Sequence, residues 1–343
     1  MQTLKKRIII LAFITLVLTG VAYFFLGPTG QAATAVEVHV TSGMSLRSIA
    51  QTLEKKQVIR WSTALILWMK ITGTSKRIQA GLVECAEHEG VIAAAQHLLK
   101  AQPIQFTVTV QEGLTVEQIA GVFHAALKID SAQFVTVCQS KTFVQSIDDS
   151  LTSCEGYLFP DTYRFPEKTT CADIVKKMIS HFEQSYAKLE AGSDSATTLQ
   201  KRHIVILASI VEKEAQLASE RPRIAAVFCN RLRLGMPLGA DPTVRYIFRK
   251  FSGPLRVSEL KTKSPYNTRL FSGLPPGPIC SPGFASLQAV LHPLLSKELY
   301  FVAKWDGSGG HDFSATYQEH TKKKDTIQKK NEQRIARGKN AHK

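Results

Sequence analysis

The sequence lacks a Cys-x-x-Cys pair, the spacing that many zinc and dithiol redox motifs share. Its six cysteines lie far apart, at positions 85, 138, 154, 171, 229 and 280. This spacing argues against zinc or redox chemistry. An exported protein could join such cysteines in disulfides, but buried free thiols fit the same spacing. The pairing is therefore open.

We also recognise no metal-binding cluster of histidine with acidic residues in the sequence. The ten histidines are scattered along the chain. His311, in Gly-Gly-His-Asp-Phe, could bind a metal, but an isolated histidine more often makes a structural or substrate hydrogen bond. We therefore predict no metal site and no cofactor, and we assign His311 a hydrogen-bonding role.

Acidic residues are scarce beside basic ones. The chain has 28 Asp and Glu against 43 Lys and Arg, a formal net charge of +15. Residues 321–343 supply about half of this excess, with nine basic residues against two acids. This segment has no aromatic residue and no nucleic-acid-binding motif, so we predict a solvated, frayed or helical tail and no nucleic-acid partner. Anionic lipid or an anionic wall polymer is the favoured partner for its charge.

Only one long hydrophobic run is present. Residues 8–26 carry no charge and follow Lys5-Lys6-Arg7. The run is long enough to span a bilayer and longer than the usual core of a signal peptide. No Lys or Arg follows until Arg47. The positive-inside rule therefore predicts a single-pass anchor with its N-terminus in the cytoplasm and the body outside. Ala33-Thr-Ala35 leaves a cleaved signal peptide as the alternative.

Two segments about seventy residues apart share one pattern. Residues 38–53 and 108–123 each open with alternating β-formers, turn at a glycine and continue into an amphipathic stretch. The pattern predicts a strand, a turn and a capped helix, and Thr115 and Gln118 have capping-box spacing. This shape resembles LysM-type modules, which bind glycans containing N-acetylglucosamine. With a further helix predicted over 91–100, we assign residues 27–125 to a LysM-like α/β region; a mere spacer is the alternative.

A buried run ends abruptly in charge near the middle of the chain. Residues 204–211 are apolar or small, and the Glu212-Lys-Glu214-Ala continuation favours a helix. On that helix Glu214 shares a stripe with its apolar i−3, i−4 and i−7 neighbours, whereas Glu212 shares a face with small and polar residues. A carboxyl held against apolar surface has a raised pKa and can act as a general acid. Glu214 is therefore the candidate; two acids that merely face water are the alternative.

Several segments of the second half are rich in Gly, Pro and aromatic residues. Residues 155–163 alternate aromatics with Gly, Pro and acids, and residues 272–283 form a Pro/Gly loop. Such segments hold a fixed path, as the wall of a binding groove must. Between these two segments, residues 225–232 predict a second amphipathic helix, and Asp241-Pro-Thr243 predicts a turn or a helix start. After them, residues 299–303 predict a buried strand.

Six motifs occur together and in order. They are Glu155-Gly-Tyr-Leu-Phe-Pro-Asp-Thr-Tyr163, Ala208-Ser-Ile-Val-Glu-Lys-Glu214, Asp241-Pro-Thr243, Tyr266-Asn-Thr268, Gly273-Leu-Pro-Pro-Gly277 and Gly310-His-Asp-Phe313. Together they resemble the MltG (YceG-like) endolytic murein transglycosylases over about residues 105–320. The anchor and the LysM-like region fit the layout of the same family.

The resemblance implies an activity. Members cleave the β-1,4 bond between N-acetylmuramic acid (MurNAc) and N-acetylglucosamine (GlcNAc) within nascent glycan strands, leave 1,6-anhydroMurNAc ends and so terminate elongation. It places the catalytic glutamate at Glu214, the residue that the helical face also selects. One carboxyl can protonate the leaving oxygen and then take the proton of the sugar's own 6-hydroxyl. The second carboxylate that hydrolysis usually needs is then unnecessary.

The resemblance also implies an organisation. We predict an α+β fold with an N-terminal transmembrane helix, a LysM-like α/β subdomain and an α+β catalytic domain. The boundaries are 1–7 for the basic N-terminus, 8–26 for the anchor, 27–125 for the LysM-like region, 126–320 for the transglycosylase domain and 321–343 for the basic tail. The implied location is the bacterial inner membrane, with the catalytic domain in the periplasm or outside the cell. The implied partners are the membrane and peptidoglycan glycan strands, with peptidoglycan synthases or divisome proteins as further candidates.

The motifs further imply a set of substrate-binding residues, with Tyr157 or Tyr163 stacking on a pyranose. The set is Glu155, Tyr157, Asp161, Tyr163, Glu220, Asn230, Asp241, Thr243, Tyr266, Asn267, Thr268 and His311.

Three positions depart from the family pattern. Gly239 replaces a Gln or similar polar residue, Ser281 replaces Asn or Thr, and Ala80-Gly-Leu-Val83 replaces an Ala-Gly-x-Tyr turn. These departures support an alternative, an inactive membrane-anchored glycan-binding scaffold for cell-wall synthesis or division proteins. Because Glu214 and its flanking motif are intact, we favour the enzyme.

Overall fold

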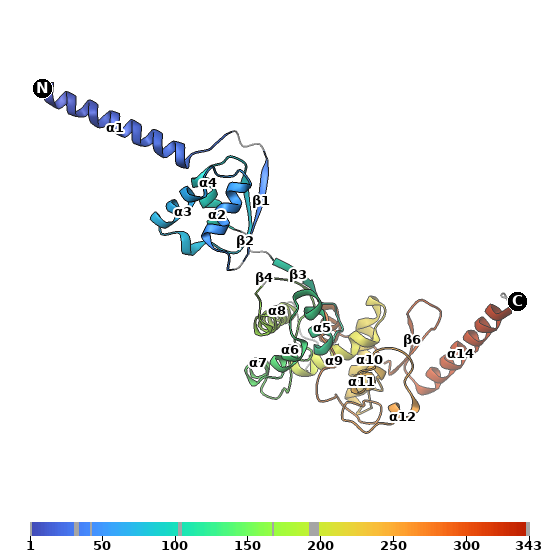
Figure 1. The fold of residues 1–343 in the computed structure, drawn as a ribbon. Helices are drawn as coiled ribbons and strands as arrows, with labels where there is room; N and C mark the ends of the chain where they lie inside the picture. The colour runs from blue at the N-terminus through green and yellow to red at the C-terminus, as the bar shows by residue number, and fades with distance from the viewer. Residues whose placement is uncertain are drawn as a thin grey trace. The chain divides into compact units, whose positions relative to one another are not determined.

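The structure is a computed structural model that describes residues 2–30, 34–41, 43–101, 105–166, 168–191 and 199–340. Ala33 of the possible cleavage site and the last three residues of the tail lie outside the described residues. The chain divides into two compact units, residues 1–105 and 106–343 (Figure 1).

The first unit begins with the predicted anchor. Helix α1 (Gln2–Leu26) contains a 20-residue stretch, Arg7–Leu26, that is long and apolar enough to cross a membrane. None of that stretch is buried against the protein. It is therefore consistent with a single-pass anchor, although a signal sequence has the same character.

The rest of the first unit is a small α/β body. Its elements are β1 (Ala35–Val40), α2 (Leu46–Lys55), α3 (Ser62–Ile71), the 3₁₀ turn η1 (Ser75–Arg77), β2 (Gly81–Ala86) and α4 (Val91–Leu99). Strands β1 and β2 pair antiparallel, with Val38 opposite Val83. Alternate residues of both strands are buried in one core with the apolar faces of α2, α3 and α4. This alternation is what a two-stranded sheet covered on one face requires. The helix predicted over 91–100 is confirmed as α4.

The second unit is mostly helical. Its elements are β3 (Gln105–Thr109), α5 (Val116–Leu127), α6 (Ser131–Cys138), α7 (Lys141–Ile147), β4 (Thr162–Pro166), α8 (Cys171–Ala191), α9 (Lys201–Glu214), the 3₁₀ turn η2 (Ala218–Glu220), α10 (Arg221–Arg233), α11 (Asp241–Ile247), α12 (Val257–Leu260), α13 (Phe284–Leu291), β5 (Tyr300–Ala303), β6 (His311–Ser314) and α14 (Tyr317–Asn340). Strand β3 neighbours β4, and β5 pairs antiparallel with β6. The predicted α+β class is confirmed.

The internal repeat is real in local structure but falls in two units. Both copies form a strand, a turn and a capped helix, and the capping box of Thr115 and Gln118 is present. In the second copy, Phe123 of α5 packs on Phe134 and Phe165, with ring centroids 5.7 and 5.6 Å apart. Its apolar face therefore belongs to the second unit, whose boundary at 105/106 lies earlier than the predicted end of the first region at 125. The LysM likeness stays a prediction.

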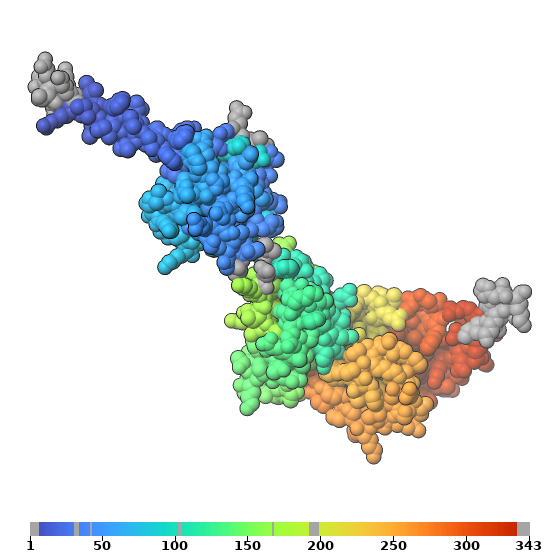
Figure 2. All heavy atoms as spheres, in the orientation of Figure 1, coloured from blue at the N-terminus to red at the C-terminus, as the bar shows by residue number. Residues whose placement is uncertain are grey.

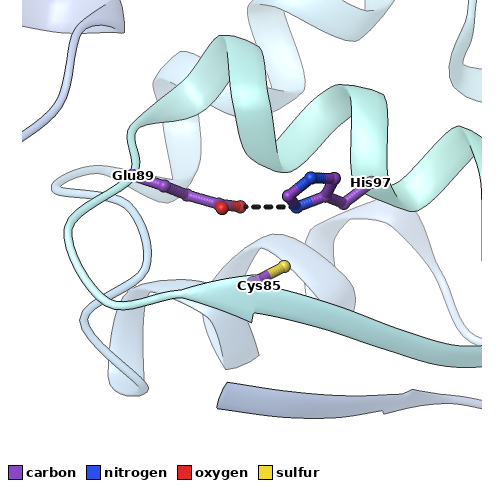
Figure 3. A group of neighbouring side chains, drawn as sticks. All are labelled: Cys85, Glu89 and His97. Carbon is purple, nitrogen blue, oxygen red and sulfur yellow. Dashed lines mark hydrogen bonds and ion pairs between the residues drawn. The ribbon is translucent and has the colours of Figure 1, made fainter. Parts of the chain in front are cut away.

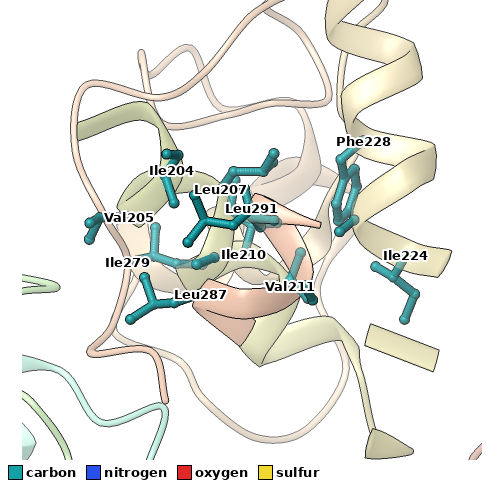
Figure 4. Packing of buried hydrophobic residues seen from close by; sticks show 14 of the residues in the cluster. Ile204, Val205, Leu207, Ile210, Val211, Ile224, Phe228, Ile279, Leu287 and Leu291 are labelled. Carbon is teal, nitrogen blue, oxygen red and sulfur yellow. The ribbon is translucent and has the colours of Figure 1, made fainter. Parts of the chain in front are cut away.

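Helix α9 forms the centre of the larger core. All eight residues from Ile204 to Val211 are buried, because α10, α13 and the loop at Ile279 pack around the helix (Figure 4). The helix ends at Glu214, and Ala215 is extended. Our predicted single apolar stripe is therefore wrong, since the helix is apolar on every side. Gln216, which we expected among the polar neighbours of Glu212 on the helix, lies beyond the helix end.

Other local predictions can be compared directly. The helix predicted over 225–232 is confirmed within α10, the Asp241 helix start is confirmed, and the described tail is helical in α14. Each of the two helices α10 and α11 carries a proline in its first turn, where the missing N–H costs nothing. Strand β5 is half-buried, not buried as predicted. It pairs with β6 in a two-stranded sheet, in which both strands are edges.

Segments distant in sequence meet on the surface of the second unit. Figure 2 shows residues around α5 to α7, in green, beside residues around α11 and α12, in orange. Arg249 and Glu117 form an ion pair across this boundary at 2.7 Å.

The six cysteines are free thiols, and all except the half-buried Cys229 are buried. Cys138 and Cys154 lie in the core of the second unit, where the Cys154 N–H donates to the Cys138 carbonyl at 2.9 Å.

Candidate active site

Glu214 is the last residue of α9 and lies where the buried run meets the surface. Its side chain is half-buried, and its carboxylate has no hydrogen-bond partner among the described residues. Burial raises the pKa of Glu214 to about 7, and the negative charge of Asp241 contributes to the rise. The positive charges of Arg245 and Arg231 oppose it. Glu214 can therefore both hold and release a proton near neutral pH.

Arg231 is the better fixed of the two cations near Glu214. Its guanidinium donates to the carbonyls of Leu299 at 2.6 Å and Leu238 at 2.7 Å. It also lies over the ring of Tyr300, 5.2 Å from the centroid. Because these contacts hold it without a carboxylate partner, its charge stays available to stabilise an anion at Glu214.

The departure at Gly239 has a physical account beside this arginine. Gly239 has a φ of +69°, in the left-handed region that disfavours side chains. A Cβ there would lie 3.1 Å from a terminal nitrogen of Arg231. Glycine is therefore suited to this turn.

Glu212, two residues before Glu214, has a different environment. Its side chain is only 6% exposed and accepts from Arg221 at 3.2 Å and from the Gly283 backbone N–H at 3.0 Å. It thus joins α9 to α10 and to the start of α13. The alternative in which both acids face water is wrong for Glu212, because those neighbours cover that side of the helix.

Glu155 is a second buried carboxyl, at the wall of a pocket of about 470 Å³. It accepts from the Val116 N–H at 3.2 Å and from the Tyr246 hydroxyl at 3.3 Å. Burial raises the pKa of Glu155 to about 8. Tyr266 and two cationic residues, Arg202 and Arg249, also line this pocket. The structure therefore brings two predicted residues, Glu155 and Tyr266, together.

Helix α11 connects the surroundings of the two carboxyls. Asp241 and Arg245, one turn apart, act electrostatically on Glu214, while the next residue, Tyr246, is bonded to Glu155. Asp241 is exposed and paired with Arg269 at 2.6 Å. One short helix thus positions groups toward both sites.

The two tyrosines predicted to stack on sugar are buried in the core. Tyr157 is 1% exposed and packs edge-on against Phe182, with centroids 5.1 Å apart. Tyr163 is 3% exposed and donates to the Phe159 carbonyl at 2.6 Å. Neither ring face is open to a pyranose, so the expected stacking is not supported.

Four further predicted residues use their polar atoms inside the protein. Asn267 donates to the carbonyls of Leu260 at 3.0 Å and Thr262 at 2.8 Å. The others are Asn230, bonded to the segment 296–298, and Thr243 and Thr268, whose hydroxyls lie 3.0 Å apart. All four are buried, which argues against direct sugar contact and for a role in holding the loops.

The three remaining predicted residues form two ion pairs. Glu220 pairs with His311, bonding the ring Nδ1 at 2.7 Å and the backbone N–H at 2.9 Å. This contact supports the hydrogen-bonding role assigned to His311. Asp161 is exposed and lies 3.4 Å from His181, beside a different hollow from that of Glu155.

Asn267→Ala is expected to lower stability more than activity. Removing its amide leaves the partly buried carbonyls of Leu260 and Thr262 without this donor, a loss of about 1–3 kcal/mol in the free energy of unfolding. Urea unfolding measures this loss, and turnover per folded molecule should stay within a few-fold. Normal stability with weakened glycan binding would instead make Asn267 a substrate contact.

Sequence reasoning missed the cations of both sites. Arg231 follows Asn230, and Arg245 and Tyr246 follow Asp241-Pro-Thr243, so adjacency to the motifs was the available signal. Arginine on a helix surface is too common for that signal to select them.

Among the described residues, one group of three could hold a metal, Cys85, Glu89 and His97 of the first unit. The sequence signal for this group was the high density of metal-ligating residue types in Cys85-Ala-Glu-His-Glu89.

A half-buried carboxyl with a pKa near neutrality, beside a fixed arginine, is typical of enzymes that use acid–base chemistry. Comparison with known proteins agrees with this class. The sequence profile of the YceG-like family matches residues 38–326 of the chain. The chain belongs to the YceG-like family.

Named relatives give the same result. The endolytic murein transglycosylase of Bacillus subtilis strain 168 is 34% identical over 87% of this chain and 87% of its own length. That of Streptococcus pneumoniae R6 is 27% identical over 83% of this chain, which spans 56% of that relative. The crystal structure of a YceG-like protein from Listeria monocytogenes matches with a TM-score of 0.58 at 29% identity, covering 84% of this chain and 99% of that one.

Proposed function

We propose that this protein is an endolytic murein transglycosylase in which Glu214 is first the general acid and then the general base. The observation that carries the assignment is the environment of Glu214: half-buried, without a hydrogen-bond partner among the described residues, and with a pKa of about 7. The relatives named as endolytic murein transglycosylases support the general activity.

The proposed reaction needs one carboxyl. Protonated Glu214 donates its proton to the glycosidic oxygen as the bond from C1 of MurNAc to the GlcNAc oxygen breaks. The resulting carboxylate is stabilised by the positive charges of Arg231 and Arg245. It then takes the proton of the 6-hydroxyl as O6 bonds to C1, which closes the 1,6-anhydro ring. Glu214 ends protonated, and no water is consumed.

The pocket at Glu155 is the proposed contact for the glycan strand. A carboxyl with a pKa of about 8 is protonated at neutral pH and can donate to a sugar hydroxyl or an acetamido carbonyl. Tyr266 and Tyr246 offer further polar edges in the same region. In this proposal Tyr266 and Asp241 contact substrate. Glu155 also contacts it, because its carboxyl lines the pocket although the residue is largely buried, and the other buried members of the predicted set position these three.

The function is tested on the full chain in detergent micelles with uncrosslinked glycan strands. Mass spectrometry of the digested strands should find 1,6-anhydroMurNAc ends that increase with time. The scaffold alternative predicts binding without such ends. Reducing ends in place of anhydro ends would show that water, not the 6-hydroxyl, attacks.

Activity should fall as the pH rises above about 7. Glu214 must start protonated to act as the acid, and its pKa is raised to about 7, so the active fraction is full below that pH and declines above it. The expected limit is about a tenfold loss of kcat/KM per pH unit. Initial rates between pH 5 and 9 measure this profile. A rate that keeps rising through pH 9 would contradict an acid role for Glu214.

The proposed location is the inner membrane, with the N-terminus in the cytoplasm and the body in the periplasm or outside. The apolar helix Arg7–Leu26 supports a membrane span, and the basic residues before it support this orientation. A reporter that is active only in the cytoplasm, fused after Lys343, should be silent, whereas the same reporter before Met1 should be active. The opposite pattern would reverse the topology. Peptidoglycan synthases and division proteins stay candidate partners.

A further inference from the structure

Three side chains of different chemistry converge in the first unit. Cys85 comes from strand β2, Glu89 from the turn that follows it, and His97 from helix α4 (Figure 3). Their ligand atoms all lie within 4.8 Å of one another. Glu89 Oε1 and His97 Nδ1 are 3.2 Å apart.

The fold holds these side chains in place. Cys85 is 4% exposed and belongs to the core of the unit. The second carboxylate oxygen of Glu89 accepts from the Ala86 N–H at 2.9 Å, which orients the first toward His97. The Glu89 side chain is 8% exposed, but that of His97 is 43% exposed, so one side of the group faces solvent.

The neighbouring acid and histidine of the same turn are held elsewhere. His88 Nδ1 lies 2.9 Å from the Thr29 hydroxyl, and Glu87 accepts from the Thr34 hydroxyl at 3.2 Å. The convergence on Cys85 is therefore selective, not a consequence of local crowding.

We propose that Cys85, Glu89 and His97 bind one zinc ion, with water as the fourth ligand on the open side of His97. A thiolate, an imidazole nitrogen and a carboxylate oxygen are the ligand types of tetrahedral zinc. Bond lengths of about 2.0–2.3 Å place such ligands about 3–4 Å apart, so small side-chain rotations close the present separations. Thiolate and imidazole disfavour magnesium and calcium, which take oxygen ligands.

Binding would release the thiol proton and link two elements. Zinc must displace this proton, and its affinity therefore rises with pH. The bound ion would join β2 to α4, two elements of one small core, and stabilise the folded first unit over the unfolded chain.

Cobalt(II) reports such a site directly. The full chain, reduced and freed of metal with a chelator, is titrated with Co²⁺ in detergent micelles and then with Zn²⁺. We expect one Co²⁺ per chain, with a thiolate-to-cobalt charge-transfer absorption that Zn²⁺ removes by competition. Cys85→Ser should abolish that absorption, whereas Cys229→Ser, at the half-buried cysteine of the second unit, should leave it unchanged.

His97→Ala keeps the test decisive if Cys85→Ser fails to fold, because the His97 side chain is 43% exposed whereas Cys85 is in the core. This variant should fold normally and bind Zn²⁺ with an affinity at least about 100-fold lower. Loss of a ligand should cost more affinity than loss of a residue that only hydrogen-bonds to a ligand. Zinc should also raise the unfolding midpoint of the wild type and not that of His97→Ala. No charge-transfer absorption, or unchanged zinc affinity in His97→Ala, would show that the three side chains lie together without binding a metal.

Discussion

Glu214→Gln is expected to abolish formation of 1,6-anhydroMurNAc ends while the protein stays folded. Glutamine keeps the shape of the side chain and removes the proton that the proposed mechanism transfers twice. General acid–base catalysis contributes about 10²–10⁴-fold, and protonation of an ether leaving group belongs at the top of that range. We therefore expect kcat to fall by about 10⁴-fold or more, measured by mass spectrometry of digested glycan strands.

The same variant should gain stability at high pH. Because the pKa of folded Glu214 is raised to about 7, from an ordinary value of 4.5, the folded state binds the proton more tightly than the unfolded chain. Wild-type stability therefore falls as the pH rises from about 4.5 to about 7, and glutamine escapes this loss. The half-buried position limits the gain to about 1–3 kcal/mol at pH 8, with almost none at pH 4.

The test has two readouts, the formation of 1,6-anhydroMurNAc ends and the pH dependence of stability. A variant that is folded and inactive, with the expected pH-dependent gain, supports an acid in a desolvated site. Normal product from Glu214→Gln would place the chemistry on another carboxyl, with Glu155 the next to test. Equal stability gains at pH 4 and pH 8 would contradict the raised pKa.

Glu212→Gln is expected to have the opposite effect, a large loss of stability. The Glu212 side chain is 6% exposed, and its charge pairs with Arg221, whose side chain is 15% exposed. Removing one partner of a buried ion pair costs about 3–5 kcal/mol. Glu112, 3.8 Å from Arg221, offsets part of this cost, so we expect a loss of about 2–4 kcal/mol, measured by calorimetry of the second unit's transition.

Arg221→Met supplies the matched control. If Glu212 acts through this pair, the double variant should lose less stability than the sum of the two single variants, with a coupling energy of about 1–3 kcal/mol. Turnover per folded molecule of Glu212→Gln should stay within about tenfold of the wild type. Additive losses, or a folded and inactive Glu212→Gln, would show that Glu212 has a role outside the ion pair.

Local signals predicted much of the fold. Uninterrupted apolar residues predicted α1, the Thr115 capping box predicted the start of α5, and Asp241-Pro predicted the start of α11. Each signal depends on groups within one or two turns of the chain, so the sequence carries it without knowledge of distant contacts. The compact units divide at 105/106, before α5, because α5 packs with Phe134 and Phe165 of the second unit, and no local signal contains that packing.

The candidate site was predicted only in part. The motifs include Glu155 and Glu214, the pKa values of which are raised by burial. They did not distinguish residues that could contact a sugar from those, such as Asn267 and Tyr157, whose atoms are used within the protein. A residue can belong to a motif because it holds a loop in place, and not only because it binds the substrate.

The sequence by itself determined the helix that ends in Glu212-Lys-Glu214, through its apolar run and the absence of Gly and Pro. It did not determine which of the two carboxyls is free. That choice depended on tertiary contacts, because Gly283 and Arg221 come from other elements and bind Glu212, while no described residue binds the Glu214 carboxylate. The same holds for Cys85, Glu89 and His97, which three elements bring together. Ionisation and pairing depend on distances across the fold, which local sequence patterns do not contain.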